Sequence, residues 1–298
     1  MKRILLLAVT CCLACLAAKA QNGEPPVGVS PSRIESGTIR STILGAEKEF
    51  RVYLPDGYDT DKERTYPVLY LLHGSGGTCD TWPKKYNMKA ITDWRMRSGF
   101  SLPMIIVMPD ARGMAENFRG KNLGYFNLPG WHYQDFFFEE FIPEIEKRYR
   151  IRGERAFRAI AGLSMGGGGT TIYAMEHPEL FCTACPLSAR VEGVPDNFDL
   201  SMADYVQGIK DHNMVEYLKN AAPEVQKAIG QIRWYIDVGD NDYLFEGSAH
   251  LYLLMRELKF PCANFRVREG THQQEYWRTA LPDVLTFVSL GFAAAMDQ

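Results

Sequence analysis

Two kinds of hydrophobic pattern divide the chain. Residues 37–44 and 47–54 alternate apolar and polar side chains on either side of Gly45-Ala46, which predicts an antiparallel hairpin. Further along, continuous apolar runs stop at Gly, Ser or Asp, which is typical of strands that are buried on both faces of a sheet. These runs cover residues 67–72, 104–108, 157–161, 181–187, 232–238 and 263–267.

Apolar residues at helical spacing lie between these runs. They predict helices over residues 131–149, 167–177, 248–258 and 274–292. Because strands and helices alternate, we expect a mostly parallel central sheet with helices on both faces, an α/β fold that begins with the antiparallel hairpin. The sheet and its helices form one predicted domain, residues 37–292. The more polar residues 190–230 predict an insertion over one end of the sheet, and residues 21–36, rich in Pro, Gly and Ser, predict a linker.

The N-terminus has the pattern of a signal peptide. Lys2 and Arg3 precede an uncharged apolar stretch over residues 4–18, and Ala18-Lys19-Ala20 fits an A-x-A cleavage site. About 15 apolar residues are too few to span a bilayer, which takes roughly 20. We therefore predict that residues 1–20 are removed near Ala20 and that the protein is secreted or periplasmic. Lipoprotein anchoring through Cys15 is the alternative, although Cys12 stands where such a motif usually has Leu.

Composition narrows the function classes. The 298 residues are 46% hydrophobic and 23% charged, as in soluble globular proteins. Net charge is −3, and removal of residues 1–20 takes away three basic residues and leaves a net charge of −6. Such a chain offers no basic field for nucleic acid, so no nucleic-acid partner is expected. The apolar run at the N-terminus is the only long one, so no membrane span is expected in the mature protein.

Cysteines give little functional signal. Cys79, Cys182, Cys185 and Cys262 remain after cleavage, too few for a disulfide framework in a chain of this length. Cys182 and Cys185 have C-x-x-C spacing, which raises a redox or zinc role. No second such pair or nearby His pair completes a metal site, so we predict small buried side chains and no metal.

Residues 162–166, Gly-Leu-Ser-Met-Gly, match the motif G-x-S-x-G. A predicted strand precedes the motif, and small residues and a predicted helix follow it, which is the context of a nucleophile elbow. Glycines flank Ser164 because the turn is tight and neighbouring backbone comes close. The pentapeptide alone is common, and its alternative explanation is a glycine-rich helix start with an incidental serine.

A serine hydroxyl needs a base to become a nucleophile. Of the six histidines, His272 is the one that follows a predicted strand after a possible acid. The loop 239–242 follows the preceding predicted strand and offers Asp240 and Asp242 as carboxylates that would fix the imidazole tautomer. Spacing alone leaves both aspartates open.

The oxyanion of an acyl-transfer reaction needs two backbone N–H donors. We predict that one is the N–H of Met165, directly after Ser164. The other is predicted to be the N–H of Ser75, in the glycine-rich loop 73–77 after the first buried strand. His73 then braces this loop and takes no part in proton transfer.

Several segments together resemble the esterase D-like branch of the α/β-hydrolases. That branch includes feruloyl and acetyl xylan esterases of carbohydrate esterase family 1, S-formylglutathione hydrolases and mycolyltransferases. The matching segments are residues 53–58, 71–74, 161–167, 239–242 and 270–272. The resemblance implies an α/β-hydrolase fold and ester hydrolysis without a metal or organic cofactor. It also points to Asp242, because the family's acid is the final Asp of a G-x-x-D loop. One position departs from the family pattern: the family commonly has Asp or Asn directly after the catalytic histidine, and this chain has Gln273 there.

Aromatic residues near the predicted loops suggest a substrate. The resemblance and the predicted secretion favour an ester of a plant polysaccharide, and an aromatic acyl group such as ferulate would stack on aromatic rings. Core packing is the alternative role for each ring. The candidates are Trp82, Tyr86, Tyr125, Phe126, Trp131, Tyr133, Tyr243 and Trp277. The proposed substrate-binding set is Trp82, Tyr125, Trp131, Tyr243 and Trp277.

Three other functions stay open beside a feruloyl esterase. An acetyl xylan esterase would need only a small acyl pocket. An acyltransferase would use a sugar as acceptor in place of water. A non-catalytic carbohydrate-binding relative is the third, and the complete set of Ser164, His272 and an aspartate argues against it.

Overall fold

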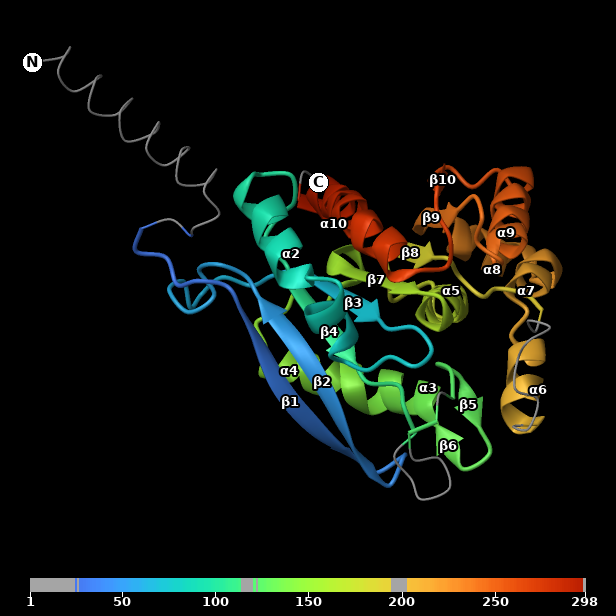
Figure 1. Cartoon of the computed structure of the whole chain (residues 1–298), viewed down its shortest axis with the longest axis horizontal. Coiled ribbons are helices and arrows are strands. Elements are labelled where there is room, and N and C mark those ends of the chain that lie inside the picture. Colours follow the sequence, from blue (N-terminus) through green and yellow to red (C-terminus); the bar gives the residue numbers. More distant parts are fainter. Residues whose placement is uncertain (1–24, 26, 114–119, 122, 194–202, 297–298) are drawn as a thin grey trace, which may run out of the picture.

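An eight-stranded sheet forms the centre of the computed structural model, which describes residues 25, 27–113, 120–121, 123–193 and 203–296 (Figure 1). The strand order is β1-β2-β4-β3-β7-β8-β9-β10. β1 pairs antiparallel with β2, and β2 with β4, while every pairing from β4 to β10 is parallel. The strands are β1 (Arg33–Ser41), β2 (Ala46–Leu54), β3 (Val68–Leu72), β4 (Ile105–Pro109), β7 (Arg158–Leu163), β8 (Thr183–Leu187), β9 (Arg233–Gly239) and β10 (Ala263–Arg268). The predicted α/β fold with its antiparallel hairpin is confirmed.

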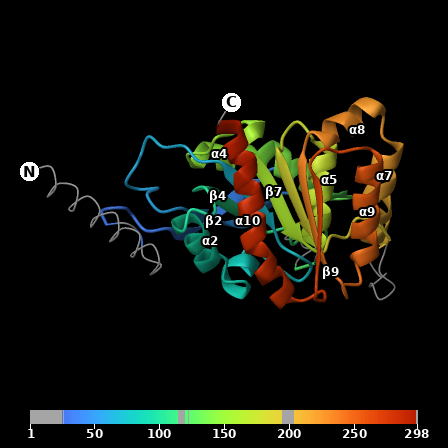
Figure 2. The ribbon, with the colours of Figure 1, turned by 90° about the horizontal axis from the view of Figure 1, so that it is seen from above.

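Helices cover both faces of the sheet, and each face has its own hydrophobic core. Figure 2 shows α2 and α10 on one face, and α5, α7 and α9 on the other. The helices are α2 (Met88–Arg97), α3 (Tyr133–Asp135), α4 (Ile142–Arg148), α5 (Met165–Glu176), α6 (Ala203–Asp211), α7 (Met214–Asn220), α8 (Pro223–Gly230), α9 (Phe245–Glu257) and α10 (Gln274–Met296). Because β3, β4 and β7 to β10 are paired in parallel, their carboxyl ends meet at one edge of the sheet.

Some predicted boundaries differ from the structure. β1 begins at Arg33, so the predicted linker 21–36 overlaps this strand by four residues. The predicted helix 131–149 is broken into the short strand β6 (Trp131–His132), which pairs with β5 (Asn127–Leu128), then α3, a π-helical turn over Phe136–Phe141, and α4. Within the predicted insertion 190–230, the described residues form α6, α7 and α8. The predicted signal peptide, residues 1–20, lies outside the described residues.

α10 is long and apolar enough to cross a membrane by length and composition, the only such helix in the described part of the chain. Its apolar side chains instead fill the core between the sheet and α2. The buried residues of α10 include Trp277, Ala280, Leu281, Val284, Leu285, Val288 and Phe292. This packing is typical of a core helix of a globular protein.

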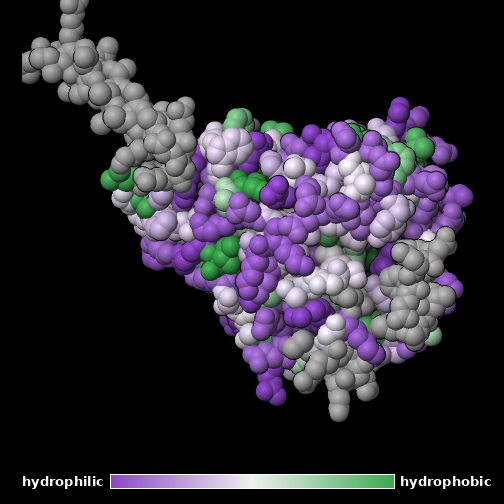
Figure 3. All heavy atoms as spheres, viewed as in Figure 1, coloured by the Kyte–Doolittle hydropathy of each residue, from purple (hydrophilic) through white to green (hydrophobic). Residues whose placement is uncertain are grey.

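The surface is mainly hydrophilic on the face that Figure 3 shows, where hydrophobic residues form small separate patches. Scattered apolar side chains of this kind are normal on a globular protein. Tyr243 is one of the exposed large side chains, at 64%, and it lies beside the residues of the site described next.

Candidate active site

Ser164 occupies a strained turn between β7 and α5. Its backbone has φ 54° and ψ −115°, a combination that is unfavourable for a residue with a side chain. A Cβ at Gly162 would lie 2.4 Å from the Gly166 carbonyl oxygen, and one at Gly166 would lie 2.6 Å from that of His73. Glycine is therefore required on both sides of Ser164, and the turn holds the serine at the edge where the parallel strands end.

Ser164 belongs to a chain of three hydrogen-bonded side chains. Its Oγ lies 2.8 Å from Nε2 of His272, and Nδ1 of His272 lies 2.9 Å from both carboxylate oxygens of Asp242. His272 stands in the loop between β10 and α10, and Asp242 stands in the loop after β9. With Nδ1–H donating to the carboxylate, Nε2 is left to accept the serine proton. The three predicted residues are thus brought together in the order that a nucleophile, a base and a carboxylate require.

The two candidate aspartates have different contacts. The Asp242 side chain is fully buried and also accepts a hydrogen bond from the Leu244 N–H at 2.9 Å. Asp240 is exposed, and its Oδ1 accepts the N–H of Gly270 at 2.9 Å. Asp240 therefore ties the loop after β9 to the loop after β10, while Asp242 contacts the imidazole.

The charge of Asp242 is stabilised by its surroundings. Burial raises the pKa of this carboxyl, but the hydrogen bonds from His272 and the Leu244 N–H outweigh burial and hold the pKa below its usual value. Asp242 is consequently ionised at neutral pH, so it can stabilise an imidazolium when His272 takes up a proton.

The loop after β3 passes directly beside Ser164. A Cβ on Gly74 would lie 2.5 Å from Cδ1 of Leu163 and 3.4 Å from Cβ of Ser164, so only glycine allows this approach. Ser75 follows in the same loop and lines one cleft with Ser164. Met165 is the first residue of α5, where backbone N–H groups have no partner within the helix. Of the two predicted donors, Met165 therefore follows Ser164 in the chain, and Ser75 lies beside it in the cleft.

His73 holds this loop in place. Its Nδ1–H donates to the Gly74 carbonyl oxygen at 2.8 Å, and its Nε2 accepts the Ala111 N–H at 2.9 Å. Burial lowers the pKa of His73 to about 4, so the ring is neutral at pH 7. A neutral ring with both nitrogens occupied by backbone groups has a bracing role, as we expected from the sequence.

A cleft of about 250 Å³ opens beside Ser164. Tyr243 and Trp277, both predicted to bind substrate, line it, and their rings lie 4.4 Å and 4.8 Å from the ring of His272. Tyr86 lines the cleft as well, and burial raises its pKa to about 12, so its hydroxyl stays protonated. Sequence reasoning missed Thr81 and Lys85 in the cleft wall, because they belong to a single π-helical turn, Thr81–Lys85, which is too short to give a periodic signal.

The other three predicted substrate-binding rings lie in the core and are at most 1% exposed. Trp82 donates its indole N–H to the Leu72 carbonyl oxygen at 2.9 Å, and the Tyr125 hydroxyl donates to the His73 carbonyl oxygen at 2.9 Å. Trp131 is covered by Lys48, whose Nζ lies 5.4 Å from the ring centroid. This placement corrects the prediction for all three, and two of them support the end of β3 instead.

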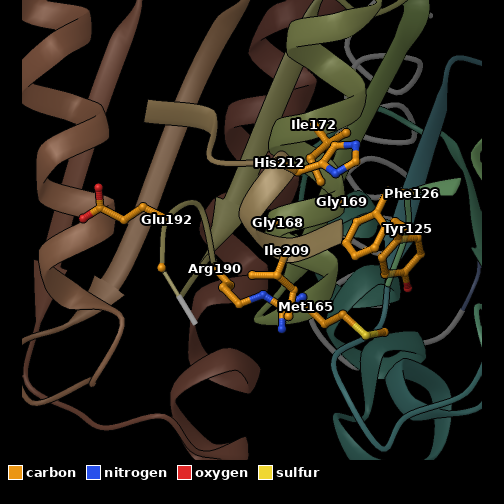
Figure 4. A pocket seen from close by; sticks show the side chains of 11 residues that line it. Tyr125, Phe126, Met165, Gly168, Gly169, Ile172, Arg190, Glu192, Ile209 and His212 are labelled. Carbon is orange, nitrogen blue, oxygen red and sulfur yellow. The ribbon is translucent and has the colours of Figure 1, made fainter. Parts of the chain in front are cut away.

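Met165 lines another, much smaller cavity. Figure 4 shows its lining, with the rings of Tyr125 and Phe126 on one side and the side chain of Glu192 pointing away. Its volume is only about 10 Å³, which is room for no more than a water molecule. Of these two spaces, the cleft at Ser164 is the one with room for an organic substrate.

The cysteines of the described residues are free thiols: Cys79, Cys182, Cys185 and Cys262. Cys182 and Cys185 are buried in and beside β8, where burial raises the pKa of both thiols. Within the part of the chain that the structure describes, no group of three or more His, Cys, Asp or Glu residues is arranged to hold a metal ion.

Comparisons with known proteins give a consistent picture. A model of the family described as "Putative esterase" matches residues 41–288. A curated endo-1,4-beta-xylanase/feruloyl esterase from Xylanibacter ruminicola is 33% identical over 232 residues, covering 76% of this chain. The chain spans only 30% of the length of that relative.

Solved structures are similar over most of the chain. A ferulic acid esterase is 38% identical, with a TM-score of 0.82, and the match covers 88% of this chain and 99% of that one. An S-formylglutathione hydrolase from Staphylococcus aureus has a TM-score of 0.68 at 21% identity, covering 87% of this chain and 100% of that one. At that identity the likeness is one of fold.

Proposed function

Because the chain belongs to the Esterase family, we propose that it is a carboxylic-ester hydrolase in which Ser164 is the nucleophile, His272 the general base and Asp242 the carboxylate that orients His272. The contact chain from Ser164 Oγ through His272 to the buried carboxylate carries this proposal. The family and the geometry agree on the same reaction class, acyl transfer from an ester to water.

The reaction proceeds in two halves. Ser164 Oγ attacks the ester carbonyl carbon while His272 Nε2 takes the serine proton. The N–H groups of Ser75 and Met165 bind the oxyanion that forms, and each donor is worth about 3 kcal/mol in the transition state. The imidazolium then gives its proton to the departing alcohol. Water repeats the same steps on the acyl-enzyme and releases the acid.

We propose a hydroxycinnamoyl ester such as ferulate on a plant polysaccharide as the substrate. The ferulic acid esterase structure and the name of the Xylanibacter ruminicola relative support this class. Tyr86, Tyr243 and Trp277 give the cleft aromatic walls, on which an aromatic acyl group stacks. A polysaccharide substrate lies outside the cell, and the signal peptide predicted over residues 1–20 would deliver the protein there.

A hydrolysis panel tests the substrate class. We expect kcat/KM to be higher for methyl ferulate than for short-chain nitrophenyl esters, with little acetate released from acetylated xylan. A preference for acetylated xylan would replace the feruloyl assignment with a deacetylase. Product analysis with an added sugar acceptor distinguishes hydrolysis from acyl transfer.

Two variants test the catalytic assignment. Ser164→Ala and His272→Ala should each lower kcat on the order of 10⁶-fold, and the double variant little more, because the two residues act as one unit. Thermal unfolding of each variant controls for misfolding. Near-normal turnover by a folded Ser164→Ala protein would refute the nucleophile assignment.

A further inference from the structure

Ser188 is a fully buried serine at the carboxyl end of β8, the strand next to the one that leads to Ser164. Its φ of 43° lies in the left-handed region, where a serine is disfavoured. The backbone is fixed there because the Ser188 N–H donates to the Asp237 carbonyl oxygen at 2.7 Å. A strained, buried polar residue beside the active site calls for an account of its hydroxyl group.

The Ser188 hydroxyl has two partners in the site. The indole N–H of Trp277 donates to Ser188 Oγ at 3.0 Å, and the Ser188 side chain favours the ionised form of the neighbouring Asp242 carboxyl, which lowers the pKa of that carboxyl. An indole N–H only donates and an ionised carboxylate only accepts, so the directions are determined. Trp277 occupies a lone pair of Oγ, and Ser188 gives its hydroxyl proton to Asp242.

We propose that Ser188, oriented by the indole of Trp277, is a positioning residue that fixes the Asp242 carboxylate for His272. The hydrogen bonds then run from Trp277 through Ser188, Asp242 and His272 to Ser164. Asp242 is held from two further sides by His272 and the Leu244 N–H. This inference rests on the proposed esterase function, because the pair that Ser188 positions has a purpose only there.

Trp277 gives this arrangement a link to the substrate cleft. The same indole that contacts Ser188 lines the cleft and meets the His272 ring edge-on, at an interplanar angle of 89°. The side chain is only 7% exposed, so packing holds the ring and its N–H in one orientation. The Trp277 indole therefore has two contacts in this proposal: its ring forms part of the cleft wall that an acyl group touches, and its N–H orients the Ser188 hydroxyl.

Two substitutions at one position separate the hydroxyl from the backbone strain. Ser188→Ala removes the hydroxyl and keeps a Cβ at positive φ, whereas Ser188→Gly removes both the hydroxyl and the strain. We expect kcat on a nitrophenyl ester to fall on the order of tenfold in both variants, with KM little changed, because a hydrogen bond to a charged group is lost. Equal loss in both variants assigns the effect to the hydroxyl. Wild-type kcat in Ser188→Gly would overturn the proposal.

Ser248→Ala is the matched control. Ser248 is also fully buried, and its hydroxyl has no hydrogen-bond partner among the described residues. We expect this variant to retain wild-type kcat, which shows that loss of a buried serine hydroxyl alone does not lower turnover.

A double-mutant cycle tests the part of Trp277. Trp277→Phe keeps a ring in the cleft wall but removes the indole N–H. We expect it to lower kcat in the wild-type background and to have a smaller effect in the Ser188→Gly background, because its donor acts through Ser188. Additive effects in the cycle would show that Trp277 acts on the cleft alone and would overturn its orienting role.

If the wild-type protein hydrolyses no ester, the proposed function fails, whereas an active wild type with an indifferent Ser188→Gly refutes this inference alone.

Discussion

The two aspartates of one loop show how single side chains divide the work at the site. Asp242 is buried against His272, whereas Asp240 is exposed and accepts the Gly270 N–H. Both lie within four residues after the same strand, and only their direction separates them. We therefore expect activity to need the carboxylate charge at Asp242, and to need at Asp240 only an oxygen atom that accepts a hydrogen bond.

This difference predicts the outcome of matched substitutions. Asp242→Asn should lower kcat on the order of 10⁴-fold, because the amide favours the wrong imidazole tautomer and cannot stabilise the imidazolium. Asp240→Asn keeps an oxygen for the Gly270 N–H and should change kcat by less than about tenfold. Steady-state kinetics of both variants decide the matter, and a larger loss at Asp240 would reverse the assignment.

His73 predicts a pH dependence of folding stability. Its pKa of about 4 in the folded protein lies below the ordinary value of about 6.5, so the unfolded chain binds the proton more readily. The contribution of His73 to the free energy of unfolding is therefore complete above about pH 6.5 and is lost as the pH drops towards 4. At pH 5 the loss from this group is about 2 kcal/mol relative to pH 7.5.

Urea unfolding at pH 7.5 and pH 5.0 measures this loss. His73→Gln retains a donor and an acceptor but cannot be protonated, so its stability should differ less between the two pH values, by about 2 kcal/mol. The same difference in wild type and variant would show that His73 does not titrate in this range.

At the scale of elements, the junction of β7 and α5 depends on close backbone contact. A Cβ at Gly166 would lie 2.6 Å from the His73 carbonyl oxygen and 2.8 Å from that of Leu72, neither of which moves easily. Gly166→Ala should therefore destabilise the fold by about 3 kcal/mol.

Gly247 offers a control in another helix. A Cβ there would meet first the flexible side chain of Glu192, at 3.0 Å. Gly247→Ala should be neutral or stabilise α9 by about 1 kcal/mol, since Ala is the better helix former. Chemical denaturation of the two variants compares them, and equal stabilities would show that the junction tolerates a methyl group.

Elements with a strong hydrophobic signal could be predicted from the sequence. β3, β4, β7, β9 and β10 begin and end within two residues of their predicted ranges, because each is a short apolar run that stops at a polar or glycine residue. The break in the predicted helix 131–149 could not be predicted, because apolar residues of its π-helical turn, such as Phe137 and Phe141, also stand at α-helical spacing. α2 was missed because apolar and polar residues are mixed in equal numbers along it, without a continuous apolar run.

The candidate site likewise contains some residues that could be predicted from the sequence and others that could not. Ser164, Asp242 and His272 could be found because each follows a strand, and the carboxyl ends of parallel strands meet at one edge. The aromatic residues could not be sorted, since Trp82 and Trp277 both have polar and charged neighbours in the sequence, yet only Trp277 lines the cleft. Burial of a loop residue depends on which distant elements cover it, and local sequence does not record that.

At the scale of the whole molecule, the thiols show how completely the core is closed. Cys79, Cys182 and Cys185 are buried, and burial raises the pKa of Cys79 to about 12. A buried thiol that stays protonated reacts slowly with thiol reagents. Cys262 is the partly exposed one among the four.

A thiol titration of a chain that begins at Gln21 tests this. Ellman's reagent should find one reactive thiol in the native protein and four after unfolding in guanidinium without reductant. Added reductant should leave the Tm unchanged. Fewer than four thiols in the unfolded protein would reveal a disulfide and contradict the free state of the cysteines.

The position of Trp277 has an optical consequence. Its indole touches the His272 ring and faces the cleft, while Trp82, Trp131 and Trp234 are enclosed in the cores. A protonated imidazole quenches the fluorescence of an indole that it contacts far more than a neutral one does. We therefore expect the emission of Trp277 to change when the histidine gains a proton or when an acyl group covers the ring. Stopped-flow emission would follow formation and decay of the acyl-enzyme without any dye, and the signal would be missing in Trp277→Phe.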